Sequence, residues 1–394
     1  MGEPARGEGP GRAFEDGGPT LGSGQEFALK WYNLKCTLES IEKVDEGGAA
    51  VGTMQVKFTE EELLADCPVI EPLIAGAVRC HGGFDERWAY VSPRTKYRVP
   101  AIAAWGEQNC GRFSTELIDV PLERWGRSFP SVDQARFLIR AGVPEPLMAT
   151  LTRIGTVEGY GANIRLLKPK NLQRHFVEDI GGTAIDHLGG GLFEAHGRDE
   201  AGWDVEAGHR DMWFAARDIA FERRAEELDI AAMLARMGFG KSGSGSQADR
   251  LLPNDVPAEL EMMVSLMVRV LFIEISAFHT FAWAEEWMSD SELVGGDGEA
   301  ARLVSYIRAD ETPHVGYLRT AVSEMRDRTW VGDDGTQHFG ADMIGRIWKP
   351  LLAQSLGPGR DEGRRAALGE VEYWCAKHRN GSDILAEFHT LGDA

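Results

Sequence analysis

Two short motifs in the chain have the spacing of a metal-binding pair. Glu311-Thr312-Pro313-His314 and Glu206-Ala207-Gly208-His209 each place a carboxylate three residues before an imidazole. Residues three apart share one face of an α-helix, so the carboxylate oxygen and the imidazole nitrogen can hold one metal ion between them. One Glu-x-x-His motif arises often by chance. Two copies, one in each half of a helical region, indicate a metal site more specifically.

A third carboxylate, Glu274, lies within the apolar sequence 270–278. Burial of an ionised carboxylate is costly unless the group is paired or bound to a metal. If residues 257–289 and 298–328 form antiparallel helices, Glu274 lies about 19 residues before the centre of the loop and Glu311 about 17 after it. We therefore expect both carboxylates at one level of a helical bundle.

The fourth carboxylate has two candidates. Glu194 follows Phe193 on an expected helix that leads directly into the first motif. Glu178 lies 28 residues before Glu206, a separation that suits a longer helical hairpin. The sequence leaves both open and favours Glu194.

Other polar residues could support such a site. His187 and His196 flank Glu194, and either could be an extra ligand or could orient one, although packing is the commoner role of such histidines. Asp310 could orient a metal-bound histidine, but a surface ion pair with Arg308 is the favoured interpretation.

The motif set resembles the ligand set of ferritin-like di-iron carboxylate proteins, in which two helices each give a glutamate and two each give Glu-x-x-His. The resemblance covers about residues 172–328. It implies two iron ions, with manganese as the alternative metal. The implied metal ligands are Glu206 and Glu311 as bridges, His209 and His314 as ligands of one iron each, and Glu274 with Glu194 or Glu178 to complete the set.

The predicted function is that of a soluble non-haem di-iron oxidoreductase. It would activate dioxygen to hydroxylate, N-oxygenate or desaturate a small organic substrate, with electrons from a reductase, a ferredoxin or the substrate itself. Trp213 and Ala216, with Phe278 and Phe281, could line an apolar substrate pocket, although core packing is the favoured role of these residues.

Two alternative functions remain open. The same site could belong to a metal-dependent non-redox enzyme or to an iron-handling protein. The chain could instead be a non-catalytic helical interaction protein, an interpretation that requires the motif residues to lie far apart in the structure.

The elements that must position these residues are mostly helices, so the expected fold is mainly α, a ferritin-like helical bundle with a small N-terminal α/β subdomain. Pro313 is expected to kink its helix. A Gly/Ser-rich sequence near 240–250 is expected to be a flexible linker. The expected helices are 131–139, 144–154, 171–180, 183–196, 204–234, 257–289, 298–328, 341–354 and 363–378.

The N-terminal part has different signals. Residues 1–25 include 11 glycines and prolines and are expected to be a disordered tail. Residues 26–130 are expected to form the α/β subdomain, with strands within 27–38 and 49–58 and a helix after Thr59. That subdomain would act as a scaffold or in homodimer formation, and residues 131–394 would form the helical metal-binding domain.

The composition narrows the class of protein. The 394 residues include 62 acidic and 42 basic ones, a net charge of −20, which disfavours nucleic acid and anionic membranes as partners. The apolar sequence 262–283 contains Arg269, Glu274 and His279, so we expect a buried helix and not a membrane span. Five cysteines without a Cys-x-x-Cys pair favour the reducing cytoplasm.

Overall fold

The structure is a computed structural model, and it describes residues 55–121, 124–222 and 250–392. This part of the chain is mainly helical, as predicted, with a small antiparallel sheet near its N-terminal end. The α-helices are α2 (Glu60–Leu63), α3 (Arg98–Phe113), α4 (Val132–Arg140), α5 (Glu145–Gly161), α6 (Ala184–His187), α7 (Phe193–Ala201), α8 (His209–Phe221), α10 (Ala258–Met288), α11 (Glu299–Arg326), α12 (Gly340–Ser355), α13 (Pro358–Cys375) and α14 (Gly381–Gly392). The strands are β1 (Glu71–Ala75), β2 (Val78–Phe84), β3 (Tyr90–Val91), β4 (Thr329–Val331) and β5 (Gln337–Phe339).

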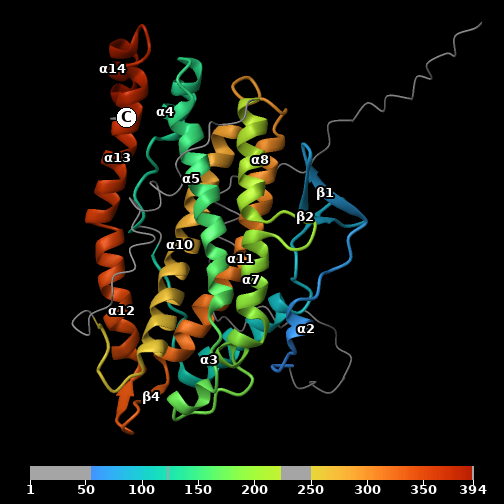
Figure 1. The fold of residues 1–394 in the computed structure, drawn as a ribbon, viewed down its shortest axis with the longest axis vertical. Helices are drawn as coiled ribbons and strands as arrows, with labels where there is room; N and C mark the ends of the chain where they lie inside the picture. The colour runs from blue at the N-terminus through green and yellow to red at the C-terminus, as the bar shows by residue number, and fades with distance from the viewer. Residues whose placement is uncertain (1–54, 122–123, 223–249, 393–394) are drawn as a thin grey trace, which may run out of the picture. The chain divides into compact units, whose positions relative to one another are not determined.

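Helices α5, α8, α10 and α11 lie side by side and enclose the main hydrophobic core (Figure 1). Within that core, the rings of Trp213 on α8 and Phe281 on α10 meet at a centroid distance of 4.8 Å. The long apolar sequence expected to be a buried helix lies inside α10. None of the described helices is both long and apolar enough to cross a lipid bilayer.

The two helices of the second half, α10 and α11, are continuous, and we call them the continuous pair. Their observed bounds confirm the helices expected over 257–289 and 298–328 within two residues. Pro313 lies inside α11, which runs as one helix from Glu299 to Arg326. The motif that contains this proline is therefore helical.

In the first half, a π-helical segment precedes α7, and a loop separates α7 from α8. We call α7 and α8 the interrupted pair. The expected helix 183–196 is divided into α6, the π-helical segment η5 (Leu188–Leu192) and α7. Gly190 and Gly191 lie in η5 with non-helical backbone angles, and Gly191 has a φ of 131°. Glycines at these positions let the chain depart from helical geometry at little steric cost.

The helix expected over 204–234 is wrong at its start, because residues 202–208 form a tight loop and α8 begins only at His209. A Cβ on Gly208 would lie 2.3 Å from the backbone nitrogen of Gly202, and Gly202 itself has a φ of 82°. Only glycine lets the two ends of the loop pack this closely. The later part of that expected helix lies outside the described residues.

The helix expected over 171–180 is also wrong in extent. The structure has only the short 3-10 segment η4 (Leu172–His175) there, after Asn171 in the left-handed region with a φ of 50°. A second 3-10 segment, η3 (Ala162–Leu166), follows α5. Residues 55–58 of the second expected strand are not in a strand.

The N-terminal elements contact the helices directly. β1, β2 and β3 form an antiparallel sheet in that order, and β2 also bonds to the loop before α8, since the His81 N–H donates to the Ala207 carbonyl at 3.0 Å. After α3, Thr115 donates a hydrogen bond to Asp327 at 2.6 Å. The expected tail, residues 240–249 of the expected linker and the expected strand within 27–38 lie outside the described residues.

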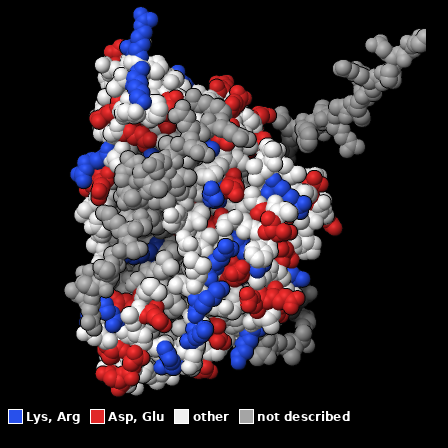
Figure 2. All heavy atoms as spheres, viewed as in Figure 1, with Lys and Arg blue, Asp and Glu red and all other residues white. Residues whose placement is uncertain are grey.

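The surface carries both charges. On the face shown in Figure 2, acidic and basic side chains are interspersed over the described helices. Some of the carboxylates counted in the net charge of −20 are buried inside the bundle.

Candidate metal centre

The continuous pair brings three predicted ligands together. Glu274 on α10 and Glu311 and His314 on α11 are all at most 4% exposed. His314 Nδ1 lies 2.6 Å from Glu311 Oε2, so the two residues of the Glu-x-x-His motif face the same point. The hairpin argument that placed Glu274 and Glu311 near one level agrees with this arrangement.

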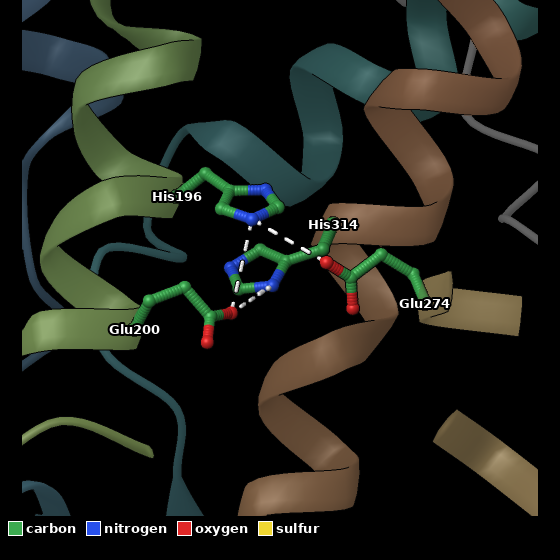
Figure 3. Close-up of side chains that lie close together, drawn as sticks. All are labelled: His196, Glu200, Glu274 and His314. Carbon is green, nitrogen blue, oxygen red and sulfur yellow. Dashed lines mark ion pairs between the residues drawn. The ribbon is translucent and has the colours of Figure 1, made fainter. Parts of the chain in front are cut away.

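Helix α7 adds two residues that face the same point, His196 and Glu200. Glu200 Oε1 lies 3.2 Å from His314 Nδ1 and 3.7 Å from His196 Nε2. His196 Nε2 also lies 3.4 Å from Glu274 Oε1. Figure 3 shows these four side chains pointing toward one another from α7, α10 and α11.

Helices α8 and α5 complete the cluster. His209 Nδ1 lies 2.9 Å from Glu311 Oε1, 3.3 Å from Glu200 Oε1 and 3.6 Å from Glu158 Oε2. Glu158, on α5, is 7% exposed. Four glutamates and three histidines thus converge: Glu158, His196, Glu200, His209, Glu274, Glu311 and His314, which we call the buried cluster.

The buried cluster contains two overlapping sets of atoms close enough to hold a metal ion. In each set the ligand atoms lie within 4.8 Å of one another. The sets are His196, Glu200, Glu274 and His314, and Glu200, His209, Glu311 and His314. The two sets share Glu200, whose two carboxylate oxygens could bridge a pair of ions, and His314, whose one free nitrogen could bind only one of them.

Three of the predicted ligands lie elsewhere. Glu206 is in the loop before α8, where its side chain is 34% exposed and pairs with Arg79 at 3.3 Å. Glu194 pairs with Arg198 on its own helix at 2.8 Å. Glu178 accepts hydrogen bonds from the N–H and the hydroxyl of Thr329. The structure does not bring these three carboxylates to the buried cluster.

The exclusion of Glu206 has a clear physical cause. The prediction required Glu206 and His209 to share one face of a helix, but the helix begins at His209 itself. The tight loop between Gly202 and Gly208 returns the chain so that His209 faces Glu200, nine residues earlier. A loop therefore replaces the helical turn that would have joined a carboxylate to this histidine.

Behind His314 lies a carboxylate held by two arginines. His314 Nε2 lies 2.8 Å from Asp199 Oδ2, and the guanidinium groups of Arg94 and Arg98 contact the same carboxylate at 2.6 and 2.8 Å. These cations hold the pKa of Asp199 well below its usual range, against the effect of burial. A buried carboxylate that accepts from Nε2 fixes the ring so that Nδ1 faces the cluster.

Behind His209 lies a second buried carboxylate, Asp310. Asp310 Oδ2 lies 3.5 Å from His209 Nε2 and accepts a hydrogen bond from the Tyr90 hydroxyl at 2.8 Å. The ring of His81 approaches the same oxygen at 3.0 Å. The surface ion pair favoured for Asp310 is wrong, because Arg308 pairs with Glu285 instead.

The charges within the buried cluster act strongly on one another. Burial, followed by the charges of the other carboxylates in the cluster, raises the pKa of Glu158 and of Glu274 well above the ordinary value of a glutamate. Burial also disfavours the charged form of Glu311, but His209 and His314 outweigh that effect and lower its pKa. Carboxylates packed this closely require protons or cations among them.

Several buried polar atoms of the cluster make no hydrogen bond to the described residues, although some of them lie within ion-pair distance of one another. They are both carboxylate oxygens of Glu200, Oε1 of Glu311, Nε2 of His196 and both ring nitrogens of His209. Buried polar groups in folded proteins are nearly always paired, so unpaired ones concentrated at one point indicate a missing partner. A metal ion is the partner that would accept both oxygen and neutral nitrogen ligands.

The aromatic residues suggested as a pocket lining have mainly a packing role. Trp213, Ala216 and Phe281 belong to the main hydrophobic core, whereas Phe278 is only partly buried. A shallow surface hollow lies over the loop before α8, and Arg79 and Trp203 are among the residues that line it.

Sequence reasoning missed Glu158 and Glu200, and it left His196 open as an extra ligand while favouring a packing role. A signal for two of them existed, since His196 and Glu200 are four residues apart and so share a helix face. Glu158 has no motif around it, and only its place on a helix of the bundle brings it to the cluster.

Comparisons of the chain with protein-family models, with curated proteins and with solved structures found no match. What the chain does is therefore argued from the buried cluster and the residues that support it.

Proposed function

We propose that the chain is a ferritin-like, non-haem di-iron oxidoreductase that activates dioxygen to oxidise a small organic substrate. The observation that carries this proposal is the buried cluster, in which four glutamates and three histidines converge from α5, α7, α8, α10 and α11. Manganese is the alternative metal.

The ligand types fit two such ions. Carboxylate oxygens and imidazole nitrogens together suit iron and manganese. The unpaired atoms of Glu200, Glu311 and His209 point to the same conclusion, because metal coordination would satisfy them without protonating the carboxylates.

The arrangement on the helices supports the ferritin-like part of the proposal. In di-iron proteins of that kind, two helices give one glutamate each and two give a glutamate and a histidine. Here α5 and α10 give Glu158 and Glu274, and α11 gives Glu311 with His314. The remaining pair, Glu200 and His209, is divided between α7 and α8 by the tight loop.

Two irons in such a site supply electrons to dioxygen when they are bound. For a hydroxylation, dioxygen, the substrate C–H group, two electrons and two protons give the alcohol and water, with the electrons from a reductase or a ferredoxin. The chain's own residues would exclude bulk water by their burial and fix the ligand rings. Tyr317 contributes to that orientation, since its hydroxyl lies 3.2 Å from His196 Nδ1.

Metal analysis of the reconstituted protein tests the proposal. After chelation and anaerobic loading with ferrous iron, we expect about two ions per chain and uptake of dioxygen when a reductant is added. Glu200→Gln should lose most of the iron, whereas Glu194→Gln, a change on the same helix, should keep it. Wild-type protein that retains only trace iron and manganese would contradict the proposal.

The same experiment separates the alternatives. Bound iron without dioxygen uptake in the reduced sample would favour a non-redox enzyme or an iron-handling protein. Absence of metal binding would favour a helical interaction protein.

A further inference from the structure

We infer that Tyr90 is a redox-active residue. Once a metal centre held by the buried cluster has been oxidised by dioxygen, Tyr90 gives one electron to that centre and its phenolic proton to Asp310, and the stacked Tyr306 then restores Tyr90. This inference rests on the proposed function, because the oxidant is the metal centre proposed above. It deepens that function by assigning a route along which electrons reach the buried cluster.

The hydroxyl of Tyr90 begins a short chain of contacts that leads to the cluster. It donates a hydrogen bond to Asp310 Oδ2 at 2.8 Å, and that oxygen lies 3.5 Å from His209 Nε2. Through its other ring nitrogen, His209 faces Glu200 and Glu311. Tyr90 is therefore two contacts away from a proposed metal ligand.

The position of the phenol depends on the backbone of β2. A Cβ on Gly82 would lie 2.6 Å from Tyr90 Oη, and Gly82 has a φ of 71°, a conformation that favours glycine. The hydroxyl can approach the strand this closely because Gly82 has no side chain. His81, the preceding residue, directs its ring to the same Asp310 oxygen. β2 therefore places both the phenol and the carboxylate that accepts its hydrogen bond.

On its other side, Tyr90 packs against aromatic rings that lead to the surface. The ring of Tyr306, on α11, is stacked on it at a centroid distance of 4.3 Å. Phe84 meets the rings of Tyr90 and Tyr306 edge-on at 6.3 and 5.8 Å. Trp88, which is 67% exposed, lies 6.1 Å from Phe84. A reductant at the surface can therefore pass electrons to Tyr90 through rings that contact one another.

The proposed step balances in electrons and protons. Oxidation of Tyr90 breaks its O–H bond, and the electron passes to the oxidised metal centre and the proton to Asp310, which leaves a neutral tyrosyl radical. Tyr306 then returns one electron to Tyr90 while Asp310 returns the proton. Tyr306 is partly exposed, so its own proton passes to water. The reductase or ferredoxin of the proposed function supplies one electron to Tyr306, which recovers a proton from water.

Tyr317 also touches a proposed metal ligand, but its surroundings differ. Its hydroxyl lies 3.2 Å from an imidazole nitrogen, His196 Nδ1, and the residue is fully buried. Its aromatic neighbours among the described residues are Phe193 and His196, which lie inside the bundle. Tyr317→Phe is therefore the matched control for Tyr90→Phe, because each variant removes one hydroxyl beside the cluster.

Electron paramagnetic resonance of the full-length protein loaded with ferrous iron tests the inference. The sample is mixed with dioxygen in the absence of a reductant and rapidly frozen. We expect a radical signal that changes shape when the protein contains ring-deuterated tyrosine. Tyr90→Phe should lose most of this signal per bound iron, whereas Tyr317→Phe should retain it.

A second variant keeps the phenol and moves it. In Gly82→Ala, the new Cβ would displace the Tyr90 hydroxyl from Asp310, so the signal per bound iron should fall as well. Circular dichroism and thermal unfolding confirm that each variant is folded before it is loaded with iron.

Tyr306→Phe tests the outer part of the route. The radical should still form on Tyr90, but its decay after addition of reduced methyl viologen should slow by about tenfold, because the stacked donor is lost. Equal decay in this variant and in the wild type would overturn the role assigned to Tyr306.

The outcomes separate the inference from the proposed function. A wild-type protein that binds iron and takes up dioxygen without forming a radical would overturn the inference and leave the proposed function in place. A signal that persists in Tyr90→Phe, or that is lost in Tyr317→Phe instead, would do the same. A wild-type protein that binds no iron would overturn both.

Discussion

The continuous pair and the interrupted pair present metal ligands in different ways. On α11, Glu311 and His314 are three residues apart on one uninterrupted helix. On α7 and α8, Glu200 and His209 are nine residues apart and belong to different helices. Both pairs nevertheless place a carboxylate and an imidazole in the same buried cluster.

The difference shows that a carboxylate and an imidazole can be brought together without the three-residue spacing of a single helix. A continuous helix fixes the two side chains by its period. The interrupted pair fixes them by the approach of two backbones at Gly202 and Gly208, and by the bonds of β2 to Ala207. The first solution is visible in a short motif, and the second depends on tertiary contacts.

The largest expected effect comes from the continuous pair. Glu311→Gln removes the carboxylate that faces both His209 and His314, so metal affinity should fall by at least about 100-fold. Equilibrium dialysis with iron or manganese measures the change. Glu178→Gln is the control, because Glu178 bonds to Thr329 and not to the cluster. Equal losses in the two variants would contradict the assigned ligands.

The next effect comes from the interrupted pair. In Gly208→Ala, the new Cβ would lie 2.3 Å from the Gly202 nitrogen and 2.5 Å from the Asp199 carbonyl oxygen, so the loop must move. We expect a loss of about 3 kcal/mol in the free energy of unfolding. Metal binding should also weaken, because movement of the loop would displace His209, the next residue. Gly190→Ala is the matched control, since a Cβ there meets nothing within 4 Å. Similar urea denaturation curves for the two variants would disprove the close-contact explanation.

A third effect tests a contact between α11 of the continuous pair and α6, the short helix that precedes η5 and α7. Glu324 on α11 accepts hydrogen bonds from the N–H groups of Ala184 and Ile185 at the start of α6. Burial raises its pKa from 4.5 to about 7. The folded state therefore binds a proton on the Glu324 carboxyl more tightly than the unfolded state does. This difference stabilises the folded state fully below pH 4.5, and the stabilisation is lost as the pH rises through 7.

Measured against Glu324→Gln, which does not titrate, the wild type should lose about 3 kcal/mol of stability across that interval. Urea denaturation of both proteins at a series of pH values measures the difference. A difference between them that stays constant with pH would contradict the shifted pKa.

The smallest effect is expected at Glu206, the predicted ligand that lies in the loop before α8 and outside the buried cluster. Glu206→Gln breaks only an exposed ion pair with Arg79. Pairs of this kind contribute little, so the free energy of unfolding should change by less than about 0.5 kcal/mol and metal content should stay the same. A loss of metal in this variant would show that Glu206 reaches the cluster after all.

Much of the continuous pair was predictable from the sequence. The helix bounds, the burial of Glu274 and its level relative to Glu311 follow from apolar periodicity and from the length of the hairpin. These are local properties of one chain segment and its neighbour. His209 was also identified, although for the wrong reason, because its expected partner Glu206 lies in a loop.

The rest of the site could not be predicted because it depends on contacts between distant segments. Glu158 reaches the cluster from α5, and Arg94 and His81 come from the region in which no metal-ligand spacing was found. No periodicity encodes these contacts. Side chains of that N-terminal region contact the carboxylates behind both histidines.

The contact between Gly202 and Gly208 also limits which sequences can keep this loop. A clash between side chains can be relieved by a second substitution that shortens the other side chain. Here the close atoms belong to the backbone on both sides, so no second substitution can create the missing space. The two glycines therefore have to be retained together, or the loop has to be replaced as a unit.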